Sequence, residues 1–115
     1  MSPLSTMRSI PRTLPSPPAI TMYGPEVCPN CDKAKAMLDA KGIEYTKIDI
    51  EHGDDAYRFV TEALGYRQAP VIVIEHAGKI LAHWGGHRMD MLMALVRLCT
   101  TGIVAQTDDD QAGAA

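Results

Sequence analysis

Two cysteines three positions apart constrain this chain more than any other feature. In Cys28-Pro29-Asn30-Cys31, a helix would place both sulfurs on one face, within reach of a disulfide bond. Pro29 predicts that a helix begins here, because its fixed φ and missing N–H suit the first helical position. Cys28 would then cap the helix and face the unpaired amides of its first turn, a placement that lowers a cysteine pKa from about 8.5 to roughly 3.5–7.5. We therefore expect Cys28 to attack a disulfide and Cys31, one turn inside the helix, to resolve the mixed disulfide.

The bulk composition narrows the class of protein. A chain of 115 residues forms one domain, and a net charge of -3 without any run of Lys or Arg argues against a nucleic-acid partner. Three cysteines are too few for a secreted disulfide scaffold, and pairing Cys28 with Cys31 leaves Cys99 odd. No apolar stretch approaches the roughly 20 residues of a membrane span. These features predict a monomer in the cytoplasm, without a membrane partner.

The two ends of the chain differ in composition from its middle. Residues 1–19 hold five of the eight prolines among Ser and Thr, and residues 103–115 contain the acidic run 108–110. Neither composition packs a core or propagates a helix. We expect a disordered Pro-rich extension over 1–19, an ordered domain over 20–102 and a disordered acidic tail over 103–115.

Hydrophobic periodicity within residues 20–102 alternates between strand and helix. Strands are predicted at 20–23, 43–50, 71–74 and 79–83, and helices over 29–41, from Asp54 or Asp55 to Gly65, and from about Arg88 to Gly102. The order β-α-β-α-β-β-α gives an α/β fold, a four-stranded mixed sheet flanked by three helices. With a dithiol at the first helix, this is the minimal thioredoxin-type layout at glutaredoxin size.

Several segments resemble the NrdH-redoxins, glutaredoxin-sized proteins that behave like thioredoxins and supply electrons to class Ib ribonucleotide reductase. They are residues 20–23, the dithiol, Gly42-Ile43-Glu44-Tyr45, residues 64–71 with Arg67-Gln68-Ala69-Pro70, and Trp84-Gly85-Gly86-His87-Arg88. The resemblance implies a dithiol-disulfide oxidoreductase that needs no bound cofactor. The implied partners are the large subunit of ribonucleotide reductase, or other protein disulfides, and a flavoprotein thioredoxin reductase that restores the dithiol with electrons from NADPH.

The resemblance also assigns a partner-binding surface. It makes Pro70 the cis-proline that faces the dithiol, which would leave the N–H and C=O of Ala69 free to pair with an extended partner segment. Trp84, beside a double glycine, is expected to be partly exposed as an apolar docking patch, with core packing as the alternative. The full set expected at this surface is Pro29, Asn30, Arg67, Gln68, Ala69, Pro70, Trp84, Gly85, Gly86, His87 and Arg88.

Some positions depart from the family pattern. Relatives often have Lys or Arg three residues before the first cysteine, where this chain has Pro25 followed by Glu26. The pair Pro29-Asn30 and the paired glycines Gly85-Gly86 are similar to those of glutathione-dependent glutaredoxins, and residues 49–52 resemble mycoredoxins. The alternative is therefore a glutaredoxin or mycoredoxin that is recycled by glutathione or mycothiol.

A rival from another class is a module that binds a metal or an iron-sulfur cluster. One Cys-x-x-Cys is half of a zinc site, but the sequence has no second such pair, and its four histidines lack the paired spacing of common zinc motifs. We expect no metal site. Cys99 is predicted to be a small buried hydrophobe without a catalytic role, and His87 a solvated side chain rather than a general base.

Overall fold

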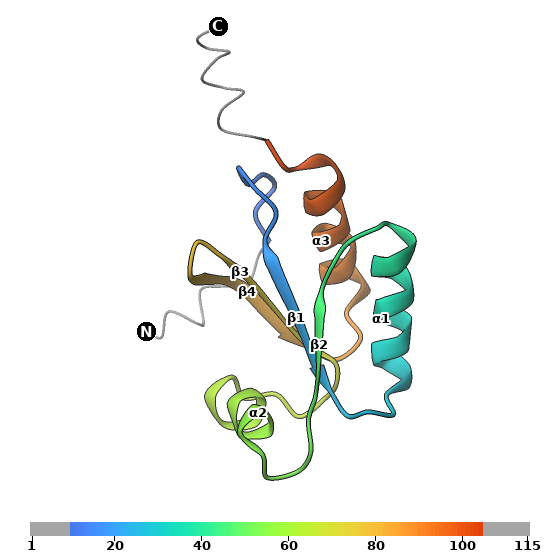
Figure 1. Ribbon diagram of the computed structural model, residues 1–115, viewed down its shortest axis with the longest axis vertical. Coiled ribbons are helices and arrows are strands. Elements are labelled where there is room, and N and C mark those ends of the chain that lie inside the picture. Colours follow the sequence, from blue (N-terminus) through green and yellow to red (C-terminus); the bar gives the residue numbers. More distant parts are fainter. Residues whose placement is uncertain (1–9, 105–115) are drawn as a thin grey trace, which may run out of the picture.

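The computed structural model of the protein describes residues 10–104, and what was expected of residues 1–9 and 105–115 lies outside this range. The elements in order are β1 (Ala19–Gly24), α1 (Pro29–Ala40), β2 (Thr46–Asp49), α2 (Asp55–Arg58), the π-helical segment η2 (Phe59–Ala63), β3 (Val71–His76), β4 (Lys79–Gly85) and α3 (Met89–Thr101) (Figure 1). This order confirms the predicted α/β fold of the thioredoxin type.

The four strands form one mixed sheet in the order β2-β1-β3-β4. β1 runs parallel to β2, with Thr21 opposite Thr46, and antiparallel to β3, with Met22 opposite Ile72. β3 and β4 form the predicted antiparallel hairpin, in which Ile72 lies opposite Trp84. The central position of β1 matters for the site, because its last residue leads through a short loop into α1.

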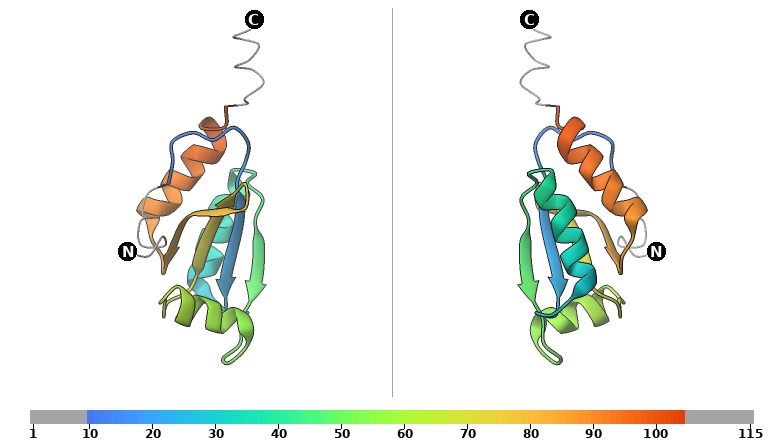
Figure 2. Two further views of the ribbon diagram at one scale, coloured as in Figure 1. Left: turned by 90° about the vertical axis from the view of Figure 1, so that its left-hand side faces the viewer. Right: turned by 90° about the vertical axis from the view of Figure 1, so that its right-hand side faces the viewer.

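The two faces of the sheet bury different residues, since successive side chains of a strand point to opposite sides. The face toward α1 and α3 carries the larger core, which includes Ile20, Met22, Ala34, Leu38, Ile72, Ile74, Ala82, Trp84, Leu92 and Leu95 together with both cysteines of the dithiol. The face toward α2 and η2 buries Val60, Val71 and Val73. Figure 2 shows α1 lying against one face of the sheet.

The ends of the helices follow local sequence signals. α1 begins with Pro29 at its first position, and the chain leaves it through Gly42, whose φ of 69° is in the left-handed region that suits glycine. Asp54 caps α2 by accepting the N–H of Tyr57 at 2.7 Å. The predicted single helix up to Gly65 is instead split, because the chain widens into the π-helical η2 after Arg58. The second strand is also shorter than predicted.

The segment just before β1 contacts the other end of the described chain. Leu14 forms a parallel bridge with Ile103: its N–H donates to the C=O of Gly102 at 2.8 Å, and its C=O accepts the N–H of Val104 at 2.7 Å. Ile10 packs against the larger core. Residues 10–18 and 103–104 are thus held by partners distant in sequence although they form no helix, and the expected bounds of the disordered ends stay a prediction.

Among residues 10–104, no helix combines the length and the apolar character needed to cross a bilayer.

Candidate active site

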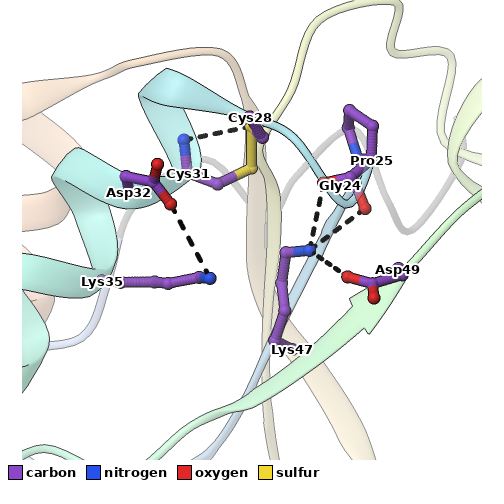
Figure 3. Close-up of a disulfide and its surroundings, with 8 residues drawn as sticks. All are labelled: Gly24, Pro25, Cys28, Cys31, Asp32, Lys35, Lys47 and Asp49. Atoms are coloured by element: carbon purple, nitrogen blue, oxygen red, sulfur yellow. Dashed lines mark hydrogen bonds and ion pairs between the residues drawn. A yellow bond between two sulfur atoms is a disulfide. The ribbon is translucent and has the colours of Figure 1, made fainter.

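The dithiol lies at the start of α1, just after the loop that connects β1 to this helix. Cys28 and Cys31 form a disulfide with an S–S distance of 2.08 Å and a Cα–Cα distance of 5.1 Å. Cys28 is the N-cap of α1, and its Sγ accepts the N–H of Cys31 at 3.1 Å (Figure 3). The predicted helix start and capping position are both confirmed.

The two sulfurs have different environments. Cys28 is 5% exposed, whereas Cys31 is completely buried. A hydrogen bond from an N–H and the positive end of a helix dipole both favour a thiolate at Cys28 once the disulfide is reduced. This arrangement fits an outer attacking sulfur and an inner resolving one, and these roles stay predictions.

The loop before β3 lies next to the dithiol. The Ala69–Pro70 peptide bond is cis, as the resemblance implied, and Pro70 is buried. A Cβ atom built on Gly24 would lie 2.5 Å from Cys31 Sγ, 3.5 Å from Cys28 Sγ and 3.6 Å from Ala69 Cβ. The end of β1, the dithiol and the cis-proline loop therefore converge on Gly24. The sequence alone did not reveal this packing role of Gly24, because its contacts come from segments distant in the chain.

The Arg67-Gln68 loop and the double glycine form one wall of the site. A Cβ on Gly85 would lie 2.6 Å from the ring of Tyr66, and one on Gly86 would meet the side chain of Gln68. The N–H of Gly86 also donates to the C=O of Pro70 at 2.9 Å. These contacts explain why the two predicted motifs occur together, since glycines at 85 and 86 let the earlier loop approach closely.

The expected exposure of Trp84 is wrong. Its side chain is 2% exposed and belongs to the same core cluster as Cys28 and Cys31. β4 continues through Gly85, and within it Trp84 and Ala82 both point toward α1 and α3. Core packing, the alternative, is correct, and Trp84 offers no apolar docking patch.

The remaining predicted residues lie at the surface. Pro29, Arg67, Gln68, His87 and Arg88 are exposed, and Asn30 is half-buried. Arg88 forms a two-pronged ion pair with Asp90, at 3.0 and 2.9 Å. These hydrogen bonds raise the pKa of Arg88 and lower that of Asp90. Arg88 is therefore already engaged, whereas none of the ion pairs among residues 10–104 involves Arg67.

Val27 is the apolar residue that sequence reasoning missed. It directly precedes the nucleophile candidate and is 84% exposed. The signal was its position, since a loop that must present Cys28 to a partner also presents the residue before it. Val27 thus exposes apolar surface beside the dithiol, which Trp84 does not.

A cavity of ≈ 400 Å³ opens on the α2 side of the dithiol loop. It reaches Pro25 and the segment 66–69, and its lining combines apolar and aromatic side chains with polar ones: Tyr23, Pro25, Ile50, His52, Tyr57, Val60, Thr61, Tyr66, Arg67, Gln68, Ala69 and Val71. The exposed Arg67 gives this cavity a cationic group.

Other reactive side chains lie away from this site. Cys99 is half-buried against the larger core, and burial raises the pKa of its thiol. Within residues 10–104, no three His, Cys, Asp or Glu side chains come together in a way that could hold a metal ion.

The fold and the capped dithiol define a redox protein of the thioredoxin class. The family model for glutaredoxin matches residues 20–77. Because this match spans half of the chain, the protein belongs to the glutaredoxin family, and its relatives place it among the NrdH-like members.

Three comparisons support this placement. The chain is 33% identical over 85 residues to the gene 56 protein of Mycobacterium phage L5, covering 74% of this chain and 77% of the relative. It is 31% identical over 77 residues to the glutaredoxin-like protein NrdH of Salmonella typhimurium, covering 67% and 88%. The solved structure of NrdH-redoxin from Escherichia coli aligns with a TM-score of 0.52 at 29% identity, covering 65% of this chain and 91% of that one. The protein is thus a thiol-disulfide oxidoreductase with the pair Cys28 and Cys31.

Proposed function

We propose that the protein reduces disulfides of partner proteins in the cytoplasm, with the large subunit of ribonucleotide reductase as its target and thioredoxin reductase as its reductant. The observation that carries the proposal is the capped dithiol, with Cys28 at the N-cap of α1 and 5% exposed, Cys31 completely buried and Val27 exposed just before Cys28. Similarity to proteins named NrdH supports the choice of target.

The reaction moves two electrons from the dithiol to the target. The Cys28 thiolate attacks one sulfur of the target disulfide, forms a mixed disulfide and releases the other sulfur as a thiolate. Cys31 then loses its proton and attacks Cys28 Sγ, which releases the second target thiolate and closes the Cys28–Cys31 disulfide. The target gains the two electrons that the redoxin loses. The protons given up by Cys28 and Cys31 go to solvent, and the two target thiolates take up protons from it.

Charge and apolar surface near the dithiol favour a protein as reductant. Glutathione is an anionic tripeptide, so its site needs fixed positive charge. The loop before Cys28 instead offers Pro25 and Glu26, and Arg88 is paired with Asp90. A protein can cover Val27 and pair with the backbone of Ala69, burying apolar area that gains roughly 25 cal/mol per Å² before the costs of association.

One observation favours recycling by glutathione or mycothiol instead. Arg67 takes part in none of the described ion pairs, and it lines a cavity of ≈ 400 Å³ beside the dithiol loop. A low-molecular-weight thiol with carboxylates would find one cation there. The two candidates differ in how the oxidised protein is reduced.

The test is NADPH consumption by the oxidised protein, with thioredoxin reductase in one assay and glutathione plus glutathione reductase in the other. We expect rapid turnover in the first assay and slow turnover in the second. Arg67→Glu serves as a probe of the glutathione route, since loss of this cation would weaken glutathione-driven turnover. Efficient turnover with glutathione and none with thioredoxin reductase contradicts the proposal.

A further inference from the structure

Lys47 reaches from β2 to the loop that carries the dithiol. Its Nζ donates to the C=O of Gly24 at 3.2 Å and to the C=O of Pro25 at 3.3 Å, and it pairs with Asp49 at 2.5 Å. The side chain is only 16% exposed. Figure 3 shows the ammonium aimed at the Gly24–Pro25 turn, with the disulfide beyond the same turn.

Gly24 contacts both Lys47 and the dithiol. A Cβ on Gly24 would contact both Sγ atoms, while its carbonyl accepts from Lys47. Because the Lys47 side chain is 16% exposed, solvent screens its charge less than that of a fully exposed lysine.

We propose that Lys47 is the positioning residue that supplies the fixed positive charge of the dithiol site. It holds the Gly24–Pro25 turn in place and stabilises the thiolate that Cys28 forms when it loses its proton. The lysine or arginine that is absent at position 25 is thereby replaced from the neighbouring strand. The inference rests on the thiol-disulfide activity and not on the choice of partner or reductant.

The other charged groups around the dithiol do not supply this field. On α1, Asp32 pairs with Lys35 at 3.8 Å, and after β4 Arg88 pairs with Asp90; Lys35 is 32% exposed and Arg88 50% exposed, so solvent screens both cations more than Lys47. Asp49, 58% exposed, offsets part of the Lys47 charge. The remaining titratable groups of the flanking loops are Glu26, His52, Arg67 and His87, all of which are exposed.

Three variants test the inference through the pH titration of thiolate absorbance in the reduced protein. An opposite charge at about 4–6 Å lowers a pKa by about 1–3 units. Lys47 bonds to the Gly24 carbonyl and not to a sulfur, so we expect a smaller effect. Lys47→Gln should raise the pKa of the Cys28 thiol by about 0.5–1 unit. Asp49→Asn should shift that pKa in the opposite direction. Lys47→Arg keeps the charge and should stay close to the unmodified protein.

The reduction potential gives a second readout. Loss of the charge destabilises the reduced thiolate form, so Lys47→Gln should have a more negative reduction potential than the unmodified protein. At a pH above the thiol pKa, a rise of one unit in that pKa corresponds to about 30 mV. A lower melting temperature in Lys47→Gln with an unchanged thiol pKa would overturn the inference and leave Lys47 as a purely structural tie. If Lys47→Gln does not fold, Asp49→Asn decides alone, and an unchanged or raised thiol pKa in that variant also overturns it.

Discussion

At the scale of single residues, the two sulfurs of the dithiol have unequal positions, and this inequality predicts a division of labour. Cys28→Ser should abolish disulfide reduction, because it removes the only sulfur of the pair that is not completely buried. Cys31→Ser should accumulate a mixed disulfide with the target, visible as a mass shift that a reductant reverses. Cys99→Ser is the matched control and should keep full activity. Full turnover by Cys31→Ser with a protein disulfide would show that the dithiol mechanism is wrong.

Gly24 is a second residue whose role follows from contacts alone. Gly24→Ala places a methyl group 2.5 Å from the buried Cys31 Sγ, and overpacking of this kind typically costs about 1–3 kcal/mol. We expect a lower midpoint in urea unfolding of the oxidised protein. Pro25→Ala, at the exposed next position, is the control and should change the midpoint little. A Gly24→Ala protein as stable as the unmodified one would mean that the loop shifts freely away from the dithiol.

At the scale of elements, the start of α2 depends on one carboxylate. Asp54 accepts the N–H of Tyr57 and the N–H of Glu51, and these hydrogen bonds lower its pKa, that from Tyr57 most. The lowered pKa means that the ionised form stabilises the fold above the unfolded pKa of about 3.9, and that this contribution is lost as pH falls through the folded pKa. The difference in melting temperature between the unmodified protein and Asp54→Ala should therefore be constant from pH 5 to 7 and shrink below about pH 4. A difference that persists at pH 2 would assign the effect to something other than the charge.

The elements also show how far sequence reasoning extends. Pro29 and Gly42 fixed the bounds of α1, and the β-branched run at 71–74 identified β3, because those signals act within a few residues. The burial of Trp84 was not predictable in the same way, since it depends on β4 continuing through Gly85 and on which face the strand turns toward α3. Lys47 looked like an ordinary strand residue, because its carbonyl partners lie more than 20 positions away. Local patterns therefore predicted the scaffold and the dithiol, whereas contacts between distant segments decided the surroundings of the site.

At the scale of the whole molecule, the described chain closes on itself away from the dithiol. Residues 10–18, the blue segment before β1 in Figure 2, run along α3 and pass over its C-terminal end. Leu14 joins Gly102 and Val104 through two backbone hydrogen bonds, and the Ser16 hydroxyl lies 2.8 Å from His76 Nε2 at the end of β3. The N-terminal segment thus connects α3 with the β3–β4 hairpin.

Removing this segment should destabilise the protein without touching the dithiol. A protein of residues 19–102 loses both Leu14 hydrogen bonds, worth about 0.5–1.5 kcal/mol each, and uncovers core that Ile10 contacts. We expect a net loss of about 1–2 kcal/mol, and for a domain of this size each kcal/mol lowers the melting temperature by roughly 4–8 °C. The matched control is a protein of residues 10–104, which keeps these contacts, and both shortened proteins should have the same thiol pKa at Cys28. Equal melting temperatures for 19–102 and 10–104 would show that the N-terminal segment contributes no net stability.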